Sequence, residues 1–544
     1  MMSTSQPLSA KHLLKLGWGA LSNKNNQEAI QFSQQLTKLY PDNGEGWYFT
    51  GQVAIAISNI KAAQQSFKNA CKINPKQITW KISLIKIFFA TQQFSSTRIL
   101  LDEIHLGVLT ANEHNQVALL YSQINQANLA VYHYQKAIEL APHNYEHYYS
   151  LAAVQRHLGE LVQAEINLNR TIDLCPLDID AHALRVDLKK QTLTDNHITS
   201  LNHLLTQDLK PKQKVQVFFA LAKSYEDMQN YQASFKALKQ GTDFRREYIN
   251  YQISDDQNTM NEIQKSFDLN WYETQACTTE NQSQLDGSKA LTPIFILGMP
   301  RTGSTLTDRI MSAGLHVHSA GEINDFSRSL NLVVQSKYGA QIKSKQDFIS
   351  ASADIDYTSL GQHYLDSIEG QLIDLSNRNQ LTHFTDKLPF NFLNVGLIIK
   401  ALPQARIIHV TRNPMDTCYA IFKTLFQDAY PFSYNLKEVG QYFIQYKKLM
   451  THWSSLNEMN IHEVSYEKLV SSPIEVGQAL YEFCGLEWQD DFIEVKKQQG
   501  IVNTASASQV RQDIHQNSVL KWQQFSDQLG PLKAQLEQAG ICCD

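Results

Sequence analysis

The stretch that decides the fold of this 544-residue chain is LTPIFILGMPRTGSTLTDRIMSAG, residues 291–314. Residues 293–297 are a short apolar run, which is typical of a buried strand in a parallel sheet. A glycine-bounded loop follows over residues 298–305, and residues 306–312 have the pattern of a helix. A strand, a loop and a helix in this order place backbone N–H groups and a helix N-terminus around an anion. The sequence therefore predicts an α/β domain with an anion-binding loop.

The loop has the spacing of a P-loop, but Ser304 stands where nucleoside triphosphatases have a lysine. Because that lysine binds the β- and γ-phosphates, ATP or GTP hydrolysis is disfavoured. Arg301 supplies a positive charge inside the loop instead. The alternative interpretation is a tight turn that binds nothing. The predicted anion ligands of the loop are Arg301, Thr302, Gly303, Ser304 and Thr305.

A second anion motif lies at residues 405–416, ARIIHVTRNPMD. It predicts a buried strand, an Arg-Asn-Pro turn and a helix. Arg412, at the end of the strand, has the planar guanidinium that binds a phosphate through two parallel hydrogen bonds. The alternative for Arg412 is a surface salt bridge at a helix cap.

The segment P-R-T-G-S-T-L after a strand resembles the 5′-phosphosulfate loop of sulfotransferases, whose cosubstrate is 3′-phosphoadenosine 5′-phosphosulfate (PAPS). The resemblance covers roughly residues 291–530 and implies a P-loop-like parallel sheet. Arg412 corresponds to the arginine that binds the 3′-phosphate in this family. Ala420 stands where the family usually has a serine, so one phosphate hydrogen bond is either missing or supplied elsewhere, with Thr417 as a candidate.

Other cosubstrate residues follow from the same resemblance. Tyr466, in HEVSYEKL, matches a family tyrosine that lies beside the nucleotide, although a place in the core remains the alternative. Ser506 and Arg511 precede Lys521-Trp522 and resemble a C-terminal loop that folds over the cosubstrate. Ordinary solvated charges are the alternative for Arg511 and Lys521.

The resemblance also implies a catalytic base and a group that stabilises the leaving phosphate. Glu322 is the expected base, at the end of a second strand that we expect beside the first. His316 and His318 are competing bases, and a helix-capping role is the alternative for Glu322. Lys387, in TDKLPFN, resembles the family's K-x-P lysine and is expected to stabilise the leaving oxygen, with Arg301 sharing its charge and no metal required.

The first half of the chain is repetitive, because its prolines punctuate it at intervals of 34, 67 and 34 residues. These prolines are Pro41, Pro75, Pro142 and Pro176. Small and aromatic residues recur at fixed offsets between them, and this pattern resembles the tetratricopeptide repeat. We expect about six repeats over residues 10–245, one or two of them degenerate, a connector over 246–290 and the sulfotransferase domain over 291–544. An irregular helical bundle is the alternative for the repeats.

Composition narrows the function classes. Glycine (23) and proline (14) are scarce, which predicts a helix-rich protein rather than an all-β or disordered one. The net charge of −5 argues against binding to nucleic acid or to an anionic membrane. The seven cysteines form no metal-binding pattern, and no stretch predicts a membrane span or a secretory leader, so we expect a cytoplasmic protein without a metal.

The fold class expected is an all-α repeat solenoid followed by a sulfotransferase-type α/β domain. The arrangement is most similar to tyrosylprotein sulfotransferases and to bacterial enzymes that join tetratricopeptide repeats to such a domain. The expected function is in-line sulfuryl transfer from PAPS to an acceptor hydroxyl of a peptide, protein or glycan, which the repeats could dock. A homodimer is possible. The alternatives are a repeat scaffold with an inactive domain, which Ala420 motivates, and a P-loop kinase.

Overall fold

The computed structural model describes residues 8–274, 291–372, 378–456, 461–495 and 513–544, apart from residues 92, 106, 125 and 427. The chain divides into two compact units. The first holds the residues up to 176 except 159–161, and the second holds residues 159–161 and 177–544. No helix of the described residues is long and apolar enough to cross a membrane.

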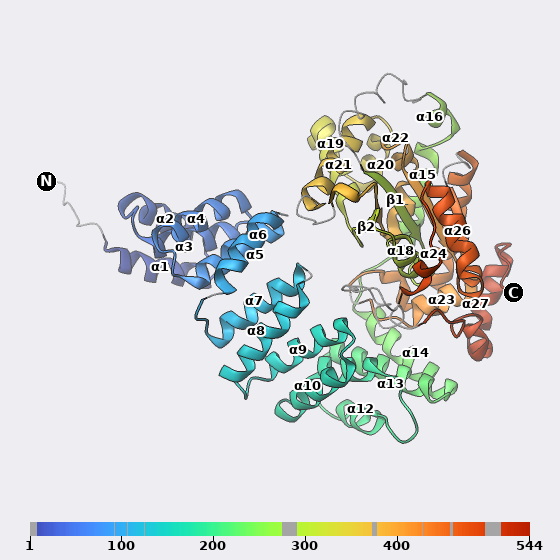
Figure 1. The fold of residues 1–544 in the computed structure, drawn as a ribbon, viewed down its shortest axis with the longest axis horizontal. Helices are drawn as coiled ribbons and strands as arrows, with labels where there is room; N and C mark the ends of the chain where they lie inside the picture. Colours follow the sequence, from blue (N-terminus) through green and yellow to red (C-terminus); the bar gives the residue numbers. More distant parts are fainter. Residues whose placement is uncertain are drawn as a thin grey trace. The chain divides into compact units, whose positions relative to one another are not determined.

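The first unit consists of helical hairpins that stack one after another (Figure 1). Small residues let the helices approach, as at Gly51, where an added Cβ would lie 2.4 Å from the Phe67 ring. Helix pairing therefore follows the small and aromatic offsets seen in the sequence. The helices are α1 (Ala10–Ser22), α2 (Asn26–Leu39), α3 (Gly44–Ala56), α4 (Ile60–Ile73), α5 (Ile78–Ala90), α6 (Phe94–His105), α7 (Ala111–Gln123), α8 (Ala127–Leu140), α9 (Tyr145–Leu158) and α10 (Leu161–Leu174).

The second unit begins with six more helices. They are α11 (Ile179–Leu188), α12 (Ile198–Leu205), α13 (Pro211–Asp227), α14 (Tyr231–Glu247), α15 (Ile253–Ser266) and α16 (Leu269–Thr274). Helices α13 and α14 form a hairpin that clusters with the α/β domain. The segment predicted as a connector contains α15 and α16, because its polar pattern still buries Met260 and Ile263 on one face. The rest of that segment, residues 275–290, lies outside the described residues.

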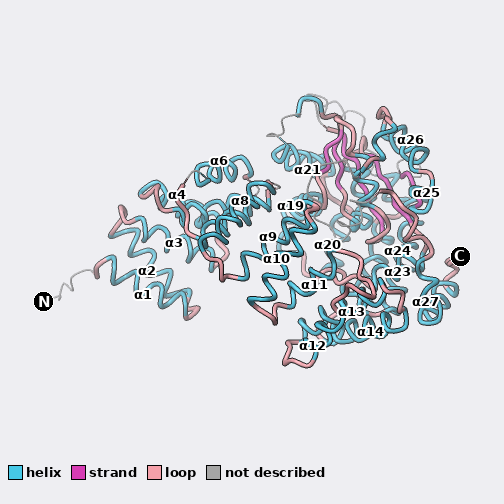
Figure 2. The backbone as a smooth tube through the Cα atoms, turned by 60° about the horizontal axis from the view of Figure 1, so that its bottom comes forward, coloured by secondary structure: helices cyan, strands magenta, loops and turns pink. Residues whose placement is uncertain are grey.

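A five-stranded parallel sheet forms the centre of the α/β domain, with helices around it (Figure 2). The strands are β1 (Thr292–Gly298), β2 (Val317–Ser319), β3 (His383–Asp386), β4 (Arg406–Thr411) and β5 (Ile461–Ser465). Their order is β2-β3-β1-β4-β5, so the central β1 is buried along nearly its whole length. These observations confirm the predicted fold class.

One expectation about the sheet is wrong. The second strand along the chain does not lie beside the first, because β3 is inserted between β1 and β2. In register, Ile294 of β1 faces Thr385 of β3, and Thr385 in turn faces Ser319 of β2. The insertion brings the ends of β2 and β3 together, which determines the site described below.

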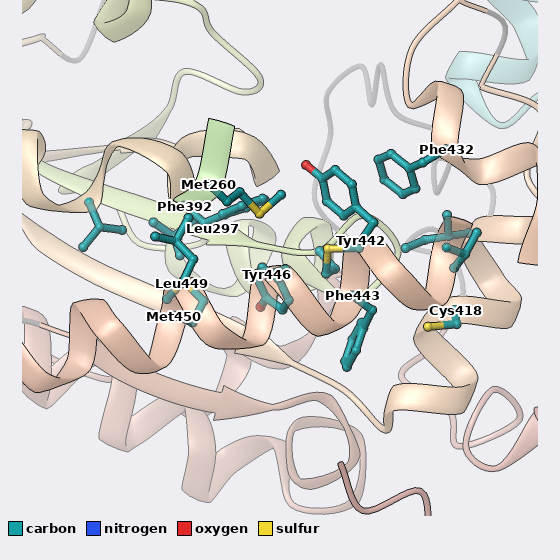
Figure 3. Close-up of a cluster of buried hydrophobic side chains, with 14 of the residues drawn as sticks. Met260, Leu297, Phe392, Cys418, Phe432, Tyr442, Phe443, Tyr446, Leu449 and Met450 are labelled. Carbon is teal, nitrogen blue, oxygen red and sulfur yellow. The ribbon is translucent and has the colours of Figure 1, made fainter. Parts of the chain in front are cut away.

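Helices pack on both sides of the sheet and carry most of the core. Beyond the repeats they are α18 (Ser304–Met311), α19 (Asp325–Tyr338), α20 (Lys345–Ser352), α21 (Tyr357–Leu372), α22 (Val395–Ala401), α23 (Pro414–Phe422), α24 (Leu436–Leu456), α25 (Tyr466–Ser471), α26 (Pro473–Cys484) and α27 (Ser526–Gln538). Helix α24 contributes Tyr442, Tyr446 and Leu449 to a buried cluster that also receives Met260 from α15 (Figure 3). Helix α15 is thereby part of the domain's core.

Candidate active site

Predicted site residues lie at the carboxyl ends of all five strands. Going across the sheet from β2 to β5, the residue at or just after each strand end is Glu322, Lys387, Arg301, Arg412 and Tyr466. In parallel α/β sheets the crevice outside these strand ends is where ligands bind. Residues that are far apart along the chain therefore meet at one edge of the sheet.

The anion loop connects β1 to α18 through three residues in the left-handed region. Gly298, Arg301 and Gly303 have φ values of +145°, +68° and +102°. A Cβ at Gly303 would lie only 2.5 Å from the Tyr466 ring, so glycine is required there both for conformation and for space. Ser304 and Thr305 begin helix α18 and are buried, so their backbone N–H groups lie at the helix N-terminus beside the loop.

A pocket opens between this loop, helix α23, Tyr466 and the C-terminal segment. Among the described residues, the lysines and arginines that line it are Arg301, Arg412, Lys423 and Lys521. Burial, and then the neighbouring Arg412, lower the pKa of Arg301 to about 10, so its guanidinium stays charged at neutral pH. The pocket therefore concentrates positive charge in a chain whose net charge is negative.

Arg412 is held in place by backbone and ring contacts. Its Nη1 donates a 3.0 Å hydrogen bond to the carbonyl of Arg301, and its Nη2 donates to the carbonyl of Ser518. The guanidinium lies 4.8 Å from the centre of the Tyr466 ring. Its Nε is buried without a hydrogen-bond partner in the described part of the chain. A buried donor in this state fits a site that receives an anion.

Helix α23 carries the departure from the family pattern. Ala420 lines the pocket and offers no hydrogen bond. Thr417 does not replace the missing serine, because it is fully buried and donates to the carbonyls of Arg412 and Asn413 instead. Lys423, which directly follows α23 and comes nearly one turn after Ala420, also lines the pocket, and the sequence analysis missed it. Its spacing of three residues from Ala420 was the available signal.

The carboxylate of Asp416 holds the C-terminal segment against the pocket. Asp416 accepts hydrogen bonds from the backbone N–H groups of Leu520 (2.6 Å) and Trp522 (2.9 Å). These two bonds hold the intervening Lys521 at the pocket. Ser506 and Arg511, which were predicted from the same loop, lie outside the described residues.

Glu322 and Lys387 meet at the ends of the adjacent strands β2 and β3. The Lys387 ammonium, whose side chain is 2% exposed, forms an ion pair with Oε1 of Glu322, whose side chain is 38% exposed. The backbone N–H of Lys387 donates to the carbonyl of Gly321 at 2.9 Å, which fixes the two loops against each other. The pair joins a buried cation to a carboxylate that solvent reaches.

The histidines that were named as competing bases differ in their surroundings. His316 is exposed, and its Nδ1 lies 2.8 Å from the carbonyl of Gln380. His318 is half-buried, and burial lowers its pKa, which favours the neutral ring. Both remain candidates.

Two buried aspartates below the strand ends were not anticipated. Asp308 of α18 accepts hydrogen bonds from Thr385 of β3 (2.5 Å) and Ser319 of β2 (2.8 Å), so it ties the anion helix to both strands. Burial raises the pKa of Asp386 to about 8. This carboxyl accepts hydrogen bonds from the Tyr364 hydroxyl (2.9 Å) and from the side-chain amide of Asn391 (3.0 Å), in the turn before α22.

Among the described residues, no group of histidine, cysteine and acidic side chains is arranged to hold a metal.

Comparisons with known proteins find matches to both parts of the chain. A model described as "Sulfotransferase family" matches residues 293–490, and tetratricopeptide repeat models match residues 114–144 and 133–166. An uncharacterized protein of Aquifex aeolicus (strain VF5) is 30% identical over 390 residues, which are 70% of this chain and 49% of that protein. Protein-tyrosine sulfotransferase A of Caenorhabditis elegans is 22% identical over 254 residues, 44% of this chain and 63% of that protein. The chain thus spans about half of the first relative and less than two thirds of the second.

Two of the solved structures that resemble part of the chain each cover 42% of it. Pseudomonas aeruginosa pilF matches at a TM-score of 0.32 with 14% identity, over 42% of this chain and 96% of that one. The C-terminal part of a TPR repeat-containing protein from Cytophaga hutchinsonii matches at a TM-score of 0.34 with 13% identity, over 42% of this chain and 93% of that one.

Proposed function

The chain carries a sulfotransferase-family domain behind tetratricopeptide repeats, and from this premise we propose that it transfers a sulfuryl group from PAPS to an acceptor hydroxyl. The observation that carries the proposal is the convergence of Glu322, Lys387, Arg301 and Arg412 on one edge of the sheet. The anion loop suits the 5′-phosphosulfate, and the Arg412 side of the pocket suits the 3′-phosphate.

The proposed reaction is an in-line displacement at sulfur. The acceptor oxygen forms a bond to sulfur while the bond from sulfur to the bridging phosphate oxygen breaks, and its electron pair leaves on adenosine 3′,5′-bisphosphate. Glu322 accepts the acceptor proton. Since Lys387 contacts Oε1 of Glu322, we assign the proton to Oε2. Lys387 and Arg301 stabilise the charge that develops on the leaving oxygen.

The pairing of Lys387 with Glu322 supports this division of labour. A buried ammonium is held by a fixed partner before the reaction, so little reorganisation is needed when negative charge appears beside it. The more exposed carboxylate is the member of the pair that an acceptor from solvent would reach.

A ligand-binding experiment tests the proposal. We expect adenosine 3′,5′-bisphosphate to raise the melting temperature and ATP with Mg²⁺ to leave it unchanged. Arg301→Ala should abolish the bisphosphate effect, whereas the control Arg328→Ala, which removes an exposed arginine of α19, should not. Stabilisation by ATP alone would instead support a kinase.

A repeat scaffold with an inactive domain is the second candidate, and Ala420 is the observation that favours it. It predicts no stabilisation by either nucleotide. Lys423 weakens this candidate, because it brings a cation to the pocket beside the missing serine. We further propose a cytoplasmic enzyme whose repeats dock a peptide, protein or glycan acceptor, with a homodimer as the assembly to test.

A further inference from the structure

The last repeat-like hairpin, α13–α14, packs directly on the α/β domain. Phe235 of α14 contacts Phe422 of α23 and Phe525 of the C-terminal segment, with ring centres 6.2 Å and 6.3 Å apart. Arg246 of α14 forms a two-pronged ion pair with Glu438 of α24, at 2.8 Å and 2.9 Å. The hairpin is therefore joined to helix α23, which lines the nucleotide pocket, and to helix α24, which does not.

Glu226, in the last turn of α13, extends from this hairpin to the pocket. Its Oε1 lies 2.8 Å from the Lys423 ammonium and 2.5 Å from the Lys521 ammonium. Its Oε2 accepts a 3.1 Å hydrogen bond from the Tyr419 hydroxyl. The Glu226 side chain is only 11% exposed. One carboxylate thus holds three groups that come from two different segments of the domain.

The two lysines that Glu226 holds both line the nucleotide pocket. Without the carboxylate, their ammonium groups would face each other in a poorly solvated place, and each would be pushed away or lose its proton. Burial, with smaller contributions from Lys521 and Arg301, lowers the pKa of Lys423 to about 8, although Glu226 opposes this change. Burial raises the pKa of Glu226, but the two lysines outweigh it and bring this pKa to about 2. The carboxylate is therefore ionised at neutral pH.

We infer that Glu226 is a positioning residue through which the repeat hairpin α13–α14 presents Lys423 and Lys521, as charged groups, to the phosphates of the nucleotide. The inference rests on the proposed function, because it takes the nucleotide to occupy this pocket. Lys423 would then supply the contact that Ala420 lacks, and the family domain would depend on a helix outside the matched residues 293–490.

The test is Glu226→Gln in the full chain, with adenosine 3′,5′-bisphosphate binding measured by calorimetry between pH 6 and pH 8.5. At pH 8 we expect the variant to bind about fivefold more weakly, because losing the carboxylate lowers the pKa of Lys423, which at about 8 already lies close to the pH of the assay. At pH 6, where Lys423 keeps its proton in both proteins, the difference should shrink to about threefold or less. A pH-dependent ratio of this kind is not expected from a merely structural role.

Glu438→Gln is the matched control, because it breaks the other ion pair that joins the hairpin to the domain but lies away from the pocket. It should lower the melting temperature without changing bisphosphate affinity. Glu226→Asp keeps the charge and should restore most of the wild-type pH profile, and it serves as the test if Glu226→Gln does not fold.

Three results would overturn the inference. They are wild-type or tighter binding by Glu226→Gln, an equal loss in Glu438→Gln, and a loss that does not change with pH. If the wild-type protein itself bound no bisphosphate, the proposed function would fall first, and this inference with it. The two failures are therefore distinguishable by the wild-type measurement alone.

Discussion

Gly303→Ala is the substitution whose cost the structure defines most closely. Two separate penalties apply at this position. Alanine at a φ of +102° is strained by about 1–2 kcal/mol. Its Cβ would also lie 2.5 Å from Cδ2 of Tyr466, so the ring must move by about 1 Å, and overpacking of this kind costs about 1–3 kcal/mol. We expect a total loss of about 2–5 kcal/mol in the free energy of unfolding of the second unit.

The assay is urea unfolding of the intact chain followed by tryptophan fluorescence, with separate transitions fitted to the two units. A double-mutant cycle separates the penalties. In a Tyr466→Ala background the collision is absent, so Gly303→Ala should cost only the strain, about 1–2 kcal/mol. Gly485→Ala is the matched control, because Gly485 has a φ of +69° and no atom within 4 Å of an added Cβ. Its cost should equal the strain part alone.

An equal cost for Gly303→Ala in both backgrounds would refute the reasoning. It would mean that the ring of Tyr466 does not rest on the loop. The same movement should disturb the proposed nucleotide pocket, because the ring of Tyr466 also lies against the Arg412 guanidinium, at 4.8 Å. Bisphosphate affinity is therefore expected to fall in Gly303→Ala and to stay unchanged in Gly485→Ala.

Three further predictions concern the edge of the sheet where catalysis is proposed. Glu322→Gln should leave bisphosphate binding within about twofold and lower the sulfuryl-transfer rate by about 10²–10⁴ in a radiolabelled-PAPS assay, and an active variant would move the base to His316 or His318. Lys387→Met should reduce kcat far more than bisphosphate affinity, because Lys387 acts on charge that appears only in the transition state, and a change confined to KM would contradict this role. The pKa of Asp386 is about 8 in the folded state and 3.8 ordinarily, so between these pH values the folded state binds a proton that the unfolded state does not. The contribution of Asp386 to the free energy of unfolding should therefore fall as the pH rises from about 4 to 8. Asp386→Asn should flatten that fall in unfolding curves measured across this range, and an unchanged slope would contradict the raised pKa.

Much of the α/β domain could be predicted because its signals are local. The run 293–297 is apolar because β1 is central and covered on both faces. Gly298 and Gly303 have positive φ values, and their spacing in the sequence already marked the two ends of the anion loop. Arg412 follows β4 directly and Arg301 comes three residues after the end of β1, so their place at the sheet edge could be predicted from chain order. The family match to residues 293–490 confirms the resemblance of the α/β domain, and the repeat matches confirm tetratricopeptide repeats within residues 114–166.

The remaining site residues could not be predicted, because they depend on contacts between distant segments. Asp308 is one charge among many along the chain, and only the folded sheet shows that it bonds to β2 and β3. The sequence suggested Thr417 as a substitute for the missing serine. In the structure its hydroxyl is turned to the backbone of α23, whereas Lys423 lines the pocket. Likewise, nothing in the spacing of α13 indicated that Glu226 would reach the pocket.

By itself, the sequence determined which chemistry is present: an anion loop without the nucleoside triphosphatase lysine, a second arginine after a strand, and a carboxylate and a lysine suited to sulfuryl transfer. Only the tertiary structure decided which of these groups touch. The order β2-β3-β1 pairs Glu322 with Lys387, 65 residues apart, and the packing of α13 places Glu226 on Lys423, 197 residues apart. The physical reason is that propensity and periodicity act over a few residues, whereas strand order and helix packing are set by burial across the whole unit.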